Sequence, residues 1–322
     1  MPRSDDGSGH ATRSPDDWGD AAERRYAECQ ARLTAEYGID AESRVADTDA
    51  AGRVHYLVAG DPEGDPVVLL HGVGTHAATW LPMVPSLAED YRVYAPDRPG
   101  RGLSAAPSYG GRDLRRFLVA YLVELFDDLG LDQPHVAGNS LGGQQAFLLA
   151  VDHDRVDRLS LVGAPGGLSR EFPPVFRLLT VHGVSRLLYW LNARGDPLEN
   201  ARESVGRFVV DDSGIPEAFY ETLAAAESLP GRAESLRSLN LEQGSFGRMH
   251  PVFDISDEVV DIRRPTLFLW GSEDVLWPPE AGRPVADRMP DATFHALPDH
   301  GHMPWLEPGE EVAPRVRSFL EE

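Results

Sequence analysis

The spacing of apolar residues changes near residue 42. Before this point, apolar side chains recur at steps of three and four between Trp18 and Tyr37, and Gly38 ends the run. This spacing predicts one amphipathic helix. After it, the apolar stretches "RVHYLVAG" and "PVVLLHG" predict strands, the second of them buried on both faces. We therefore expect a helix within residues 16–41 that packs on a larger body.

Strands and helices then alternate along the chain. The expected strands "YRVYAPD", "HVAGNS" and "RLSLVGA" are interleaved with expected helices at about 79–89, 112–129 and 142–152. The alternation resumes with "PTLFLWG" and "ATFHALPD", and with helices at about 279–289 and from about 309. Such alternation is typical of a parallel sheet that helices cover on both faces. We expect an α/β fold with a mostly parallel, doubly wound sheet.

A long segment between these two blocks has a different pattern. It is mostly helical in its apolar spacing, and Pro and Gly interrupt it at "GDPLEN", "DSGIPE" and "LPGR". We expect a disordered N-terminus at 1–15, a first core part at 42–167, a helical insertion at 168–264 and a second core part at 265–322. The aromatic residues of the insertion could line a pocket, although most are expected to pack within it. They are Phe172, Phe176, Trp190, Phe208, Phe219 and Phe246.

Charge and composition exclude several classes of partner. The chain carries 52 acidic and 30 basic residues, a net charge of −22, and every basic residue is arginine. This charge repels phosphate backbones, so nucleic acid is not an expected partner. No apolar run approaches the roughly 20 residues that span a bilayer. The polar N-terminus has no signal region, which favours the cytoplasm. Cys29 is the only cysteine, which excludes an internal disulfide and argues against a cysteine-based metal site.

One serine lies where an expected strand turns into an expected helix. The stretch "HVAGNSLGGQQAFLLA" places Ser140 between Gly138 and Gly142. In this setting, G-x-S-x-G is typical of a nucleophile elbow, in which small neighbours allow a sharp turn that raises the hydroxyl above the sheet. The following helix N-terminus favours developing negative charge. We therefore interpret Ser140 as a nucleophile rather than a tight-turn residue.

A serine nucleophile needs a base, and the base needs an orienting acid. Asp274 follows the expected strand "LFLWG", with Glu273 as its neighbouring competitor, and His300 and His302 follow the next strand. The order serine, acid, histidine is the one expected after such an elbow.

A second loop can supply hydrogen-bond donors. In "VVLLHGVGTHAATW", a glycine-flanked loop follows a buried strand, so the backbone N–H of Val73 can point toward the nucleophile. Paired with the N–H of Leu141, it predicts an oxyanion hole, worth about 3 kcal/mol or more per donor.

These segments together resemble a known superfamily. "LLHGVGT", "PDRPGRGLS", "GNSLGG", "LFLWGSEDVLWPP" and "GHMPWLEP" are similar, in this order, to signature segments of the α/β-hydrolase fold, over about residues 50–322. The resemblance implies Ser140 as nucleophile, Asp274 as acid and His302 as base, because "GHMPWLEP" is similar to the superfamily's G-H-x-P segment.

The same resemblance implies roles for the loops around the site. It implies that Val73 and Leu141 are the oxyanion donors and that the insertion is a cap over the active site. It also implies that "PDRPGRGLS" is a structural loop, with Asp97 and Arg98 holding its turn. No metal or organic cofactor is implied.

The resemblance also narrows the reaction. Ser140 argues against haloalkane dehalogenases and epoxide hydrolases, which carry aspartate at the elbow. "GNSLGG" and "LVGAPGGL" are loosely similar to meta-cleavage carbon–carbon bond hydrolases, whereas "HGVGTHAATW" differs from the "HGSGPG"-like loop usual there. We expect a serine hydrolase that forms an acyl-enzyme and cleaves a small or medium apolar carboxylic ester. Trp80, Trp277 and Met303 are the expected substrate-binding residues.

Three alternatives stay open at this point. They are cleavage of a carbon–carbon bond in a vinylogous diketone, cofactor-free acyl transfer or peroxide-dependent chemistry on the same triad, and a ligand-binding protein of the same fold with slow turnover. The expected partner is a small-molecule substrate, and the oligomeric state is undetermined.

The acidic composition generates a first prediction. A net charge of −22 causes self-repulsion, which salt relieves as the Debye length falls from about 10 Å at 0.1 M to about 3 Å at 1 M. The thermal midpoint should therefore rise when potassium chloride is increased over this range. A rising midpoint would favour adaptation of the acidic surface to high salt. A flat or falling midpoint would favour the alternative, a GC-rich genome in which arginine codons are common.

Overall fold

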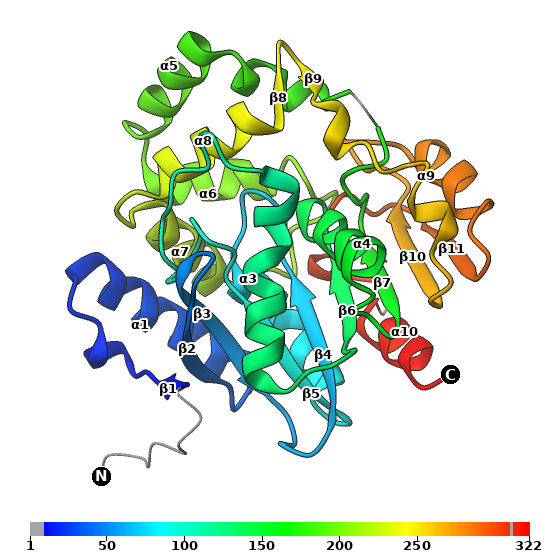
Figure 1. Ribbon diagram of the computed structural model, residues 1–322. Coiled ribbons are helices and arrows are strands. Elements are labelled where there is room, and N and C mark those ends of the chain that lie inside the picture. The colour runs from blue at the N-terminus through cyan, green and yellow to red at the C-terminus, as the bar shows by residue number, and fades with distance from the viewer. Residues whose placement is uncertain (1–9, 170, 310–311) are drawn as a thin grey trace.

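A central sheet organises the computed structural model, which describes residues 10–169, 171–309 and 312–322 (Figure 1). Within these residues the sheet has nine strands in the order β1-β2-β3-β5-β4-β6-β7-β10-β11. The strands span Ala11–Thr12 (β1), Glu42–Thr48 (β2), Gly52–Ala59 (β3), Asp65–Leu70 (β4), Tyr91–Pro96 (β5), His135–Gly138 (β6), Leu159–Val162 (β7), Thr266–Gly271 (β10) and Ala292–Leu297 (β11). Neighbours from β5 to β11 pair in parallel, and β1, β2, β3 and β5 pair antiparallel. This confirms the mostly parallel α/β fold.

Helices bury both faces of the sheet. In β4, Val67 and Leu69 face one apolar cluster, and Val68 and Leu70 face the other. Each of these side chains is at most 1% exposed, as a parallel strand covered on both sides requires. The covering helices include α2 (Val84–Leu87) and α10 (Val312–Leu320) on the first face, and α3 (Leu114–Leu129), α4 (Leu141–His153) and α9 (Pro279–Ala286) on the second.

An N-terminal helix joins the core to the inserted segment. α1 (Ala21–Glu36) begins after Asp20, whose carboxylate accepts the backbone N–H groups of Ala22 and Glu23, a typical N-cap. Tyr26 of this helix is fully buried, and the hydroxyl of Tyr26 lies 3.0 Å from Nδ1 of His76. The helix also packs against α7 (Glu217–Glu227) of the insertion.

Two expectations need correction. The helix expected at 79–89 is a 3-10 helix, η2 (Ala77–Met83), followed by one short turn, α2. Pro82 and Pro85 explain the difference, because proline has no backbone N–H for a continuous α-helical ladder. Disorder up to residue 15 is also wrong for residues 10–15, since β1 pairs with β2; residues 1–9 lie outside the described part of the chain. β2 escaped prediction because its residues are mostly polar and half-buried.

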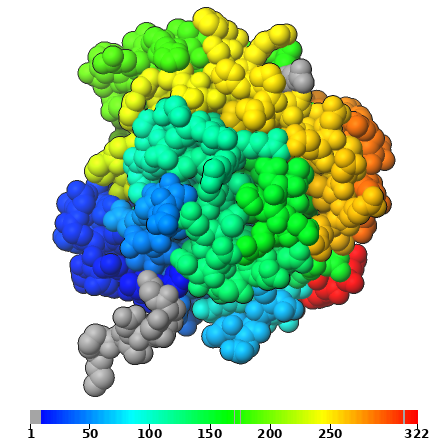
Figure 2. Space-filling model, viewed as in Figure 1, coloured from blue at the N-terminus to red at the C-terminus, as the bar shows by residue number. Residues whose placement is uncertain are grey.

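The segment 168–264 lies beyond one end of the sheet (Figure 1) and covers the top of the molecule in green to yellow in Figure 2. Its helices are α5 (His182–Asn192), α6 (Pro197–Val205), α7 and α8 (Arg232–Gln243), and a small hairpin joins β8 (Gly244–Ser245) to β9 (Arg248–Met249). Shorter 3-10 helices here and elsewhere are η1 (Pro15–Asp17), η3 (Pro174–Thr180), η4 (Pro251–Phe253), η5 (Val259–Asp261) and η6 (Pro304–Leu306).

No helix in the described ranges is both long and apolar enough to cross a membrane.

A buried polar cluster lies under the loops that follow β4 and β5. Asp97 is fully buried and accepts the N–H groups of Ala77 at 2.7 Å and Leu103 at 2.9 Å, and His55 Nδ1 lies 2.6 Å from it. Burial alone raises the pKa of Asp97, but attraction to His55 and the hydrogen bond with it hold this pKa well below its usual range. This carboxylate therefore stays charged and organises both loops.

Burial has the opposite effect on two histidines beside this cluster. Desolvation lowers the pKa of His71 to about 3 and that of His76 to about 4, from 6.5. Both rings are therefore neutral in the folded protein at neutral pH. Since the unfolded chain binds a proton at these positions below pH 6.5, the free energy of unfolding must fall on acidification between the two pKa values.

This generates a second prediction, for His76→Gln in molar potassium chloride, which screens surface repulsion. Between pH 7 and pH 5, the wild-type free energy of unfolding should fall by about 2 kcal/mol more than that of the variant, because the variant lacks this proton uptake. Urea unfolding at the two pH values measures the difference. Equal losses in both proteins would mean that His76 is not held neutral.

Candidate active site

The carboxyl ends of the parallel strands bring the candidate residues together. Ser140 follows β6, Asp274 follows β10 and His302 follows β11. Loops at one edge of a parallel sheet share one space, which is where ligand sites of open α/β sheets lie. Segments far apart along the chain therefore meet at this edge.

Ser140 occupies a strained backbone position between β6 and α4. Its φ of 53° and ψ of −118° are sparsely populated for a residue with a side chain, and such strain costs about 1–3 kcal/mol. The flanking glycines make the turn fit. A Cβ at Gly142 would lie 2.0 Å from the carbonyl oxygen of Leu70, and one at Gly138 would lie 2.5 Å from that of Gly142. The G-x-S-x-G spacing is thus a packing requirement at both glycines.

His302 and Asp274 form a buried pair. Nδ1 of His302 lies 2.7 Å from Oδ2 of Asp274, and the two residues are 4% and 5% exposed. Asp274 also accepts the backbone N–H groups of Ala164 at 3.0 Å and Leu276 at 2.9 Å. Burial raises the pKa of Asp274, but the charge and hydrogen bond of His302 and these two N–H groups outweigh it, so the pKa is lowered. The carboxylate is ionised and fixes the imidazole.

The competing residues lie differently. Nδ1 of His300 lies 2.7 Å from the carbonyl oxygen of Pro298, and its Nε2 is buried with no partner. Glu273 is exposed, and its contact is with the hydroxyl of Ser272 at 3.4 Å. The structure therefore joins Asp274 to His302 and leaves Glu273 and His300 outside this pair.

Asn139 connects the elbow to the loop 298–303, which carries His302 and is hereafter the histidine loop. The sequence pattern did not indicate this role. Its Nδ2 donates to the carbonyl oxygens of Val162 at 2.7 Å and His302 at 3.0 Å. Gly163, with φ of +76°, leaves room for this contact, because a Cβ there would lie 2.2 Å from the same His302 oxygen. One amide thus connects the end of β6 to the end of β7 and to the loop that carries His302.

The loop after β4 lies directly against the elbow. An added Cβ at Gly72 would be 3.4 Å from Cβ of Ser140. Val73 follows Gly72 in the chain and is half-buried. Leu141 is the first residue of α4, and the first N–H groups of a helix have no intrahelical acceptor. The two expected oxyanion donors therefore belong to segments that lie next to Ser140, and their role stays a prediction.

Side chains from the loop after β5 hold the loop after β4 in place. The backbone N–H of Arg98 donates to Nε2 of His71 at 2.9 Å, so the ring proton is on Nδ1, which donates to the carbonyl oxygen of Gly72 at 2.8 Å. The guanidinium of Arg98 donates to the carbonyl oxygen of Val73, and that of Arg101 to Gly74, both at 2.7 Å. This agrees with the structural role expected for Asp97 and Arg98.

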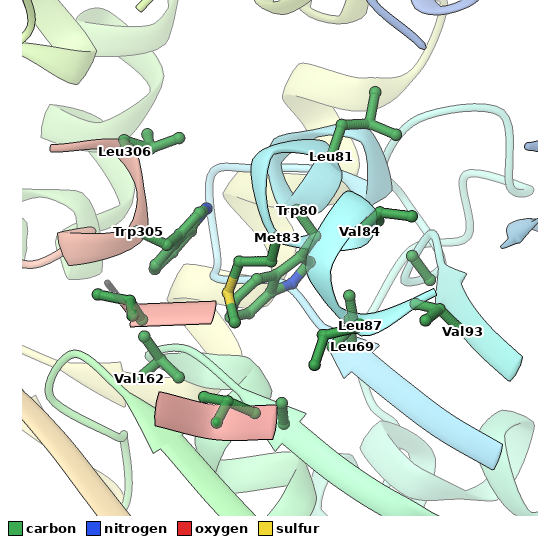
Figure 3. Packing of buried hydrophobic residues seen from close by; sticks show 14 of the residues in the cluster. Leu69, Trp80, Leu81, Met83, Val84, Leu87, Val93, Val162, Trp305 and Leu306 are labelled. Atoms are coloured by element: carbon green, nitrogen blue, oxygen red, sulfur yellow. The ribbon is translucent and has the colours of Figure 1, made fainter. Parts of the chain in front are cut away.

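The expected substrate-binding residues lie in packed surroundings. Trp80 is fully buried and its ring stacks on Trp305 at 4.3 Å between centroids (Figure 3). Met303 is 4% exposed in the same cluster, and Trp277 is half-buried against the opposite face. Substrate contact by these residues stays a prediction, and the packing of Trp80 argues against it.

Among the aromatic residues of the insertion, Phe208 is the one whose ring lies near the pair, 5.8 Å from the His302 ring and 6.2 Å from that of Phe176. Phe219 is buried in the core, and Phe246 is 83% exposed. In the described part of the chain, no group of three His, Cys, Asp or Glu side chains is placed to hold a metal ion.

Curated relatives of the chain are hydrolases. The 2-hydroxy-6-oxo-6-phenylhexa-2,4-dienoate hydrolase of Burkholderia cepacia is 32% identical over 275 residues, which cover 83% of this chain and 91% of that protein. The 2-hydroxymuconate semialdehyde hydrolase of Pseudomonas putida is 31% identical over 270 residues, covering 81% and 88%.

Solved structures and a family match agree with these relatives. The 2-hydroxy-6-oxo-6-phenylhexa-2,4-dienoate hydrolase of Rhodococcus sp. strain RHA1 superposes with a TM-score of 0.72 at 26% identity, covering 88% of this chain and all of that one. Carboxylesterase CesB of Bacillus subtilis has a TM-score of 0.73 at 22% identity, covering 94% and 99%, and so shares the fold. Residues 67–315 match the alpha/beta hydrolase family. The chain is a hydrolase and belongs to the alpha/beta hydrolase family.

Proposed function

We propose that Ser140, His302 and Asp274 form a catalytic triad that works through an acyl-enzyme. The observation that carries the proposal is the buried His302–Asp274 hydrogen bond of 2.7 Å, formed at the same sheet edge as the strained Ser140. A buried carboxylate that orients a histidine beside an elbow serine is the arrangement by which a weak hydroxyl nucleophile is activated.

Each residue then has a defined role. His302 removes the proton of Ser140 as the hydroxyl oxygen attacks a carbonyl carbon, and the ionised Asp274 stabilises the resulting imidazolium. The N–H groups of Val73 and Leu141 stabilise the negative oxygen of the tetrahedral intermediate. His302 returns the proton to the leaving group. It then removes a proton from water, which attacks the acyl carbon, and it returns this proton to the departing oxygen of Ser140.

The bond that the triad cleaves is best assigned as a carbon–carbon bond next to a ketone in a 2-hydroxy-6-oxodienoate. The Burkholderia cepacia relative reported above carries a name of this substrate class at 32% identity over most of both chains, and it favours this alternative over the apolar ester expected from the sequence. A carbon leaving group is acceptable here for the following reason. When the carbon next to the ketone is protonated, the 2-hydroxydiene becomes its 2-oxo tautomer. The electron pair of the broken bond then delocalises over the conjugated 2-oxo group.

A carboxylic ester is the second candidate. It is favoured by the loop "HGVGTHAATW", which differs from the loop expected in meta-cleavage hydrolases and borders the proposed oxyanion hole. The triad chemistry is the same for both bonds, because only the leaving atom differs.

We also propose that segment 168–264 acts as a cap that selects the substrate. Its residue Phe208 lies against His302, and its helices lie beyond the sheet end that carries the triad (Figure 1). A segment in this position can exclude water and shape the site for the apolar part of a substrate.

The third prediction tests the nucleophile and the bond together. Ser140→Ala should lower turnover by several orders of magnitude, as expected for a triad nucleophile, with little change in thermal midpoint. Turnover of 2-hydroxy-6-oxo-6-phenylhexa-2,4-dienoate and of p-nitrophenyl butyrate should be measured for both proteins. Faster Ser140-dependent turnover of the ester would favour the second candidate, and activity within about tenfold of wild type in the variant would overturn the triad.

The fourth prediction separates neighbouring side chains. Asp274→Asn should lower kcat far more than Glu273→Gln, and His302→Ala far more than His300→Ala, because only Asp274 and His302 are hydrogen-bonded to each other. Steady-state kinetics at saturating substrate measure the ranking. The reverse order in either pair would move the triad to the neighbouring residue.

A further inference from the structure

A buried carboxylate near the active site is not used by the proposed mechanism. Glu307 is 7% exposed and follows η6, the short helix after the histidine loop. Its Oε1 accepts the backbone N–H of Gly301 at 2.6 Å. Its Oε2 accepts those of Val210 at 2.6 Å and Asp211 at 3.1 Å. The two oxygens of one carboxylate therefore bind two different segments, the histidine loop and the loop between α6 and α7.

The two segments also contact each other directly beside His302. The backbone N–H groups of His302 and Met303 donate to the carbonyl oxygen of Phe208, at 2.6 Å and 3.2 Å. A Cβ at Gly301 would lie 2.5 Å from the same oxygen, so only glycine allows this approach. The Phe208 ring lies 5.8 Å from the His302 ring. The α6–α7 loop therefore forms one wall around the imidazole.

The charge of Glu307 suits this position. A carboxylate can accept hydrogen bonds on both oxygens, and hydrogen bonds from N–H groups to an ionised acceptor are about twice as strong as neutral ones. Glutamine offers one acceptor oxygen and one NH₂ donor, so it would face N–H donors with a donor on one side. An alanine would leave all three N–H groups without this acceptor.

We propose that Glu307 is a positioning residue that clamps the α6–α7 loop to the histidine loop and so holds the His302 imidazole toward Ser140. This inference rests on the proposed function of His302 as the base. Misplacement of a catalytic group by about 1 Å can cost about a hundredfold in rate, so loss of the clamp should be seen in the bond-making step.

The test uses diisopropyl fluorophosphate, which reacts with a serine that a neighbouring base activates. Glu307→Gln should slow the maximal rate of inactivation by about ten- to a hundredfold, with the half-saturating concentration of reagent little changed. Glu273→Gln is the matched control, since it neutralises an exposed carboxylate on a neighbouring loop, and it should react at the wild-type rate.

Hydrogen exchange gives a second readout that a general loss of stability would not mimic. In Glu307→Gln the amides of 208–211 and of 300–303 should both exchange faster, while the β4 and β6 amides stay protected. Where the glutamine variant does not fold, Glu307→Asp replaces it. Its shorter side chain cannot bridge both segments, so the rate of inactivation should fall in the same way, and the segment that loses the carboxylate should exchange faster. In the wild type, the amides of Gly301 and Val210 should be protected and open together.

The outcomes separate the two proposals. If Ser140→Ala reacts with the reagent as fast as wild type, the triad is wrong and the role of Glu307 fails with it. If the wild type reacts only through Ser140, but Glu307→Gln reacts at the wild-type rate or loosens only one of the two segments, the clamp is overturned and the triad stands.

Discussion

The site depends on one tight backbone turn, at which β6 ends and α4 begins. Ser140 is held at φ of 53°, which an isolated peptide would avoid, and the surroundings must supply the free energy that keeps it there. They do so by contact. Gly142 approaches the carbonyl of Leu70, and Asn139 bonds to the ends of β7 and β11. The turn therefore holds β4, β6, β7 and β11 in one arrangement, and the histidine loop is placed by the same contacts that hold the serine.

A layer of buried charge supports this arrangement from below. Arg98 and Arg101 are each 1% exposed and donate to carbonyl oxygens of the loop after β4. Asp97 offsets part of their charge and binds the start of η2. Guanidinium groups suit this work because they present several donors in a rigid plane and are weakly hydrated. The loop after β4 is therefore held through its carbonyl groups by side chains of the β5 loop.

Much of the fold and the site could be predicted from local patterns. The strand and helix periods, the glycines around Ser140 and the segments that carry Asp274 and His302 are each readable within a few residues. The helix expected at 79–89 was misjudged because its apolar spacing outweighed its two prolines. β2 was missed because a half-buried, mostly polar strand has no clear alternation.

What could not be predicted are residues whose partners lie far away in the sequence. Asn139 and Glu307 look like ordinary polar residues of their segments, and their hydrogen bonds run to positions 163 and 97 residues distant. The local pattern contains no signal for such contacts. For Asn139, the sequence gives one hint of a structural role: a polar side chain stands next to the elbow serine in a run of small and apolar residues.

The N-terminal helix has a consequence for how the chain is made. α1 is synthesised before the segments on which it packs, since Tyr26 contacts His76 and Arg32 forms an ion pair of 2.8 Å with Glu221 of α7. The part of its binding surface that α7 provides therefore exists only after most of the nascent chain has been synthesised. Contacts of such long sequence separation form slowly, because a large loop must close first. The contacts of α1 with α7 cannot form before α7 has been synthesised, and once formed they link the core to segment 168–264.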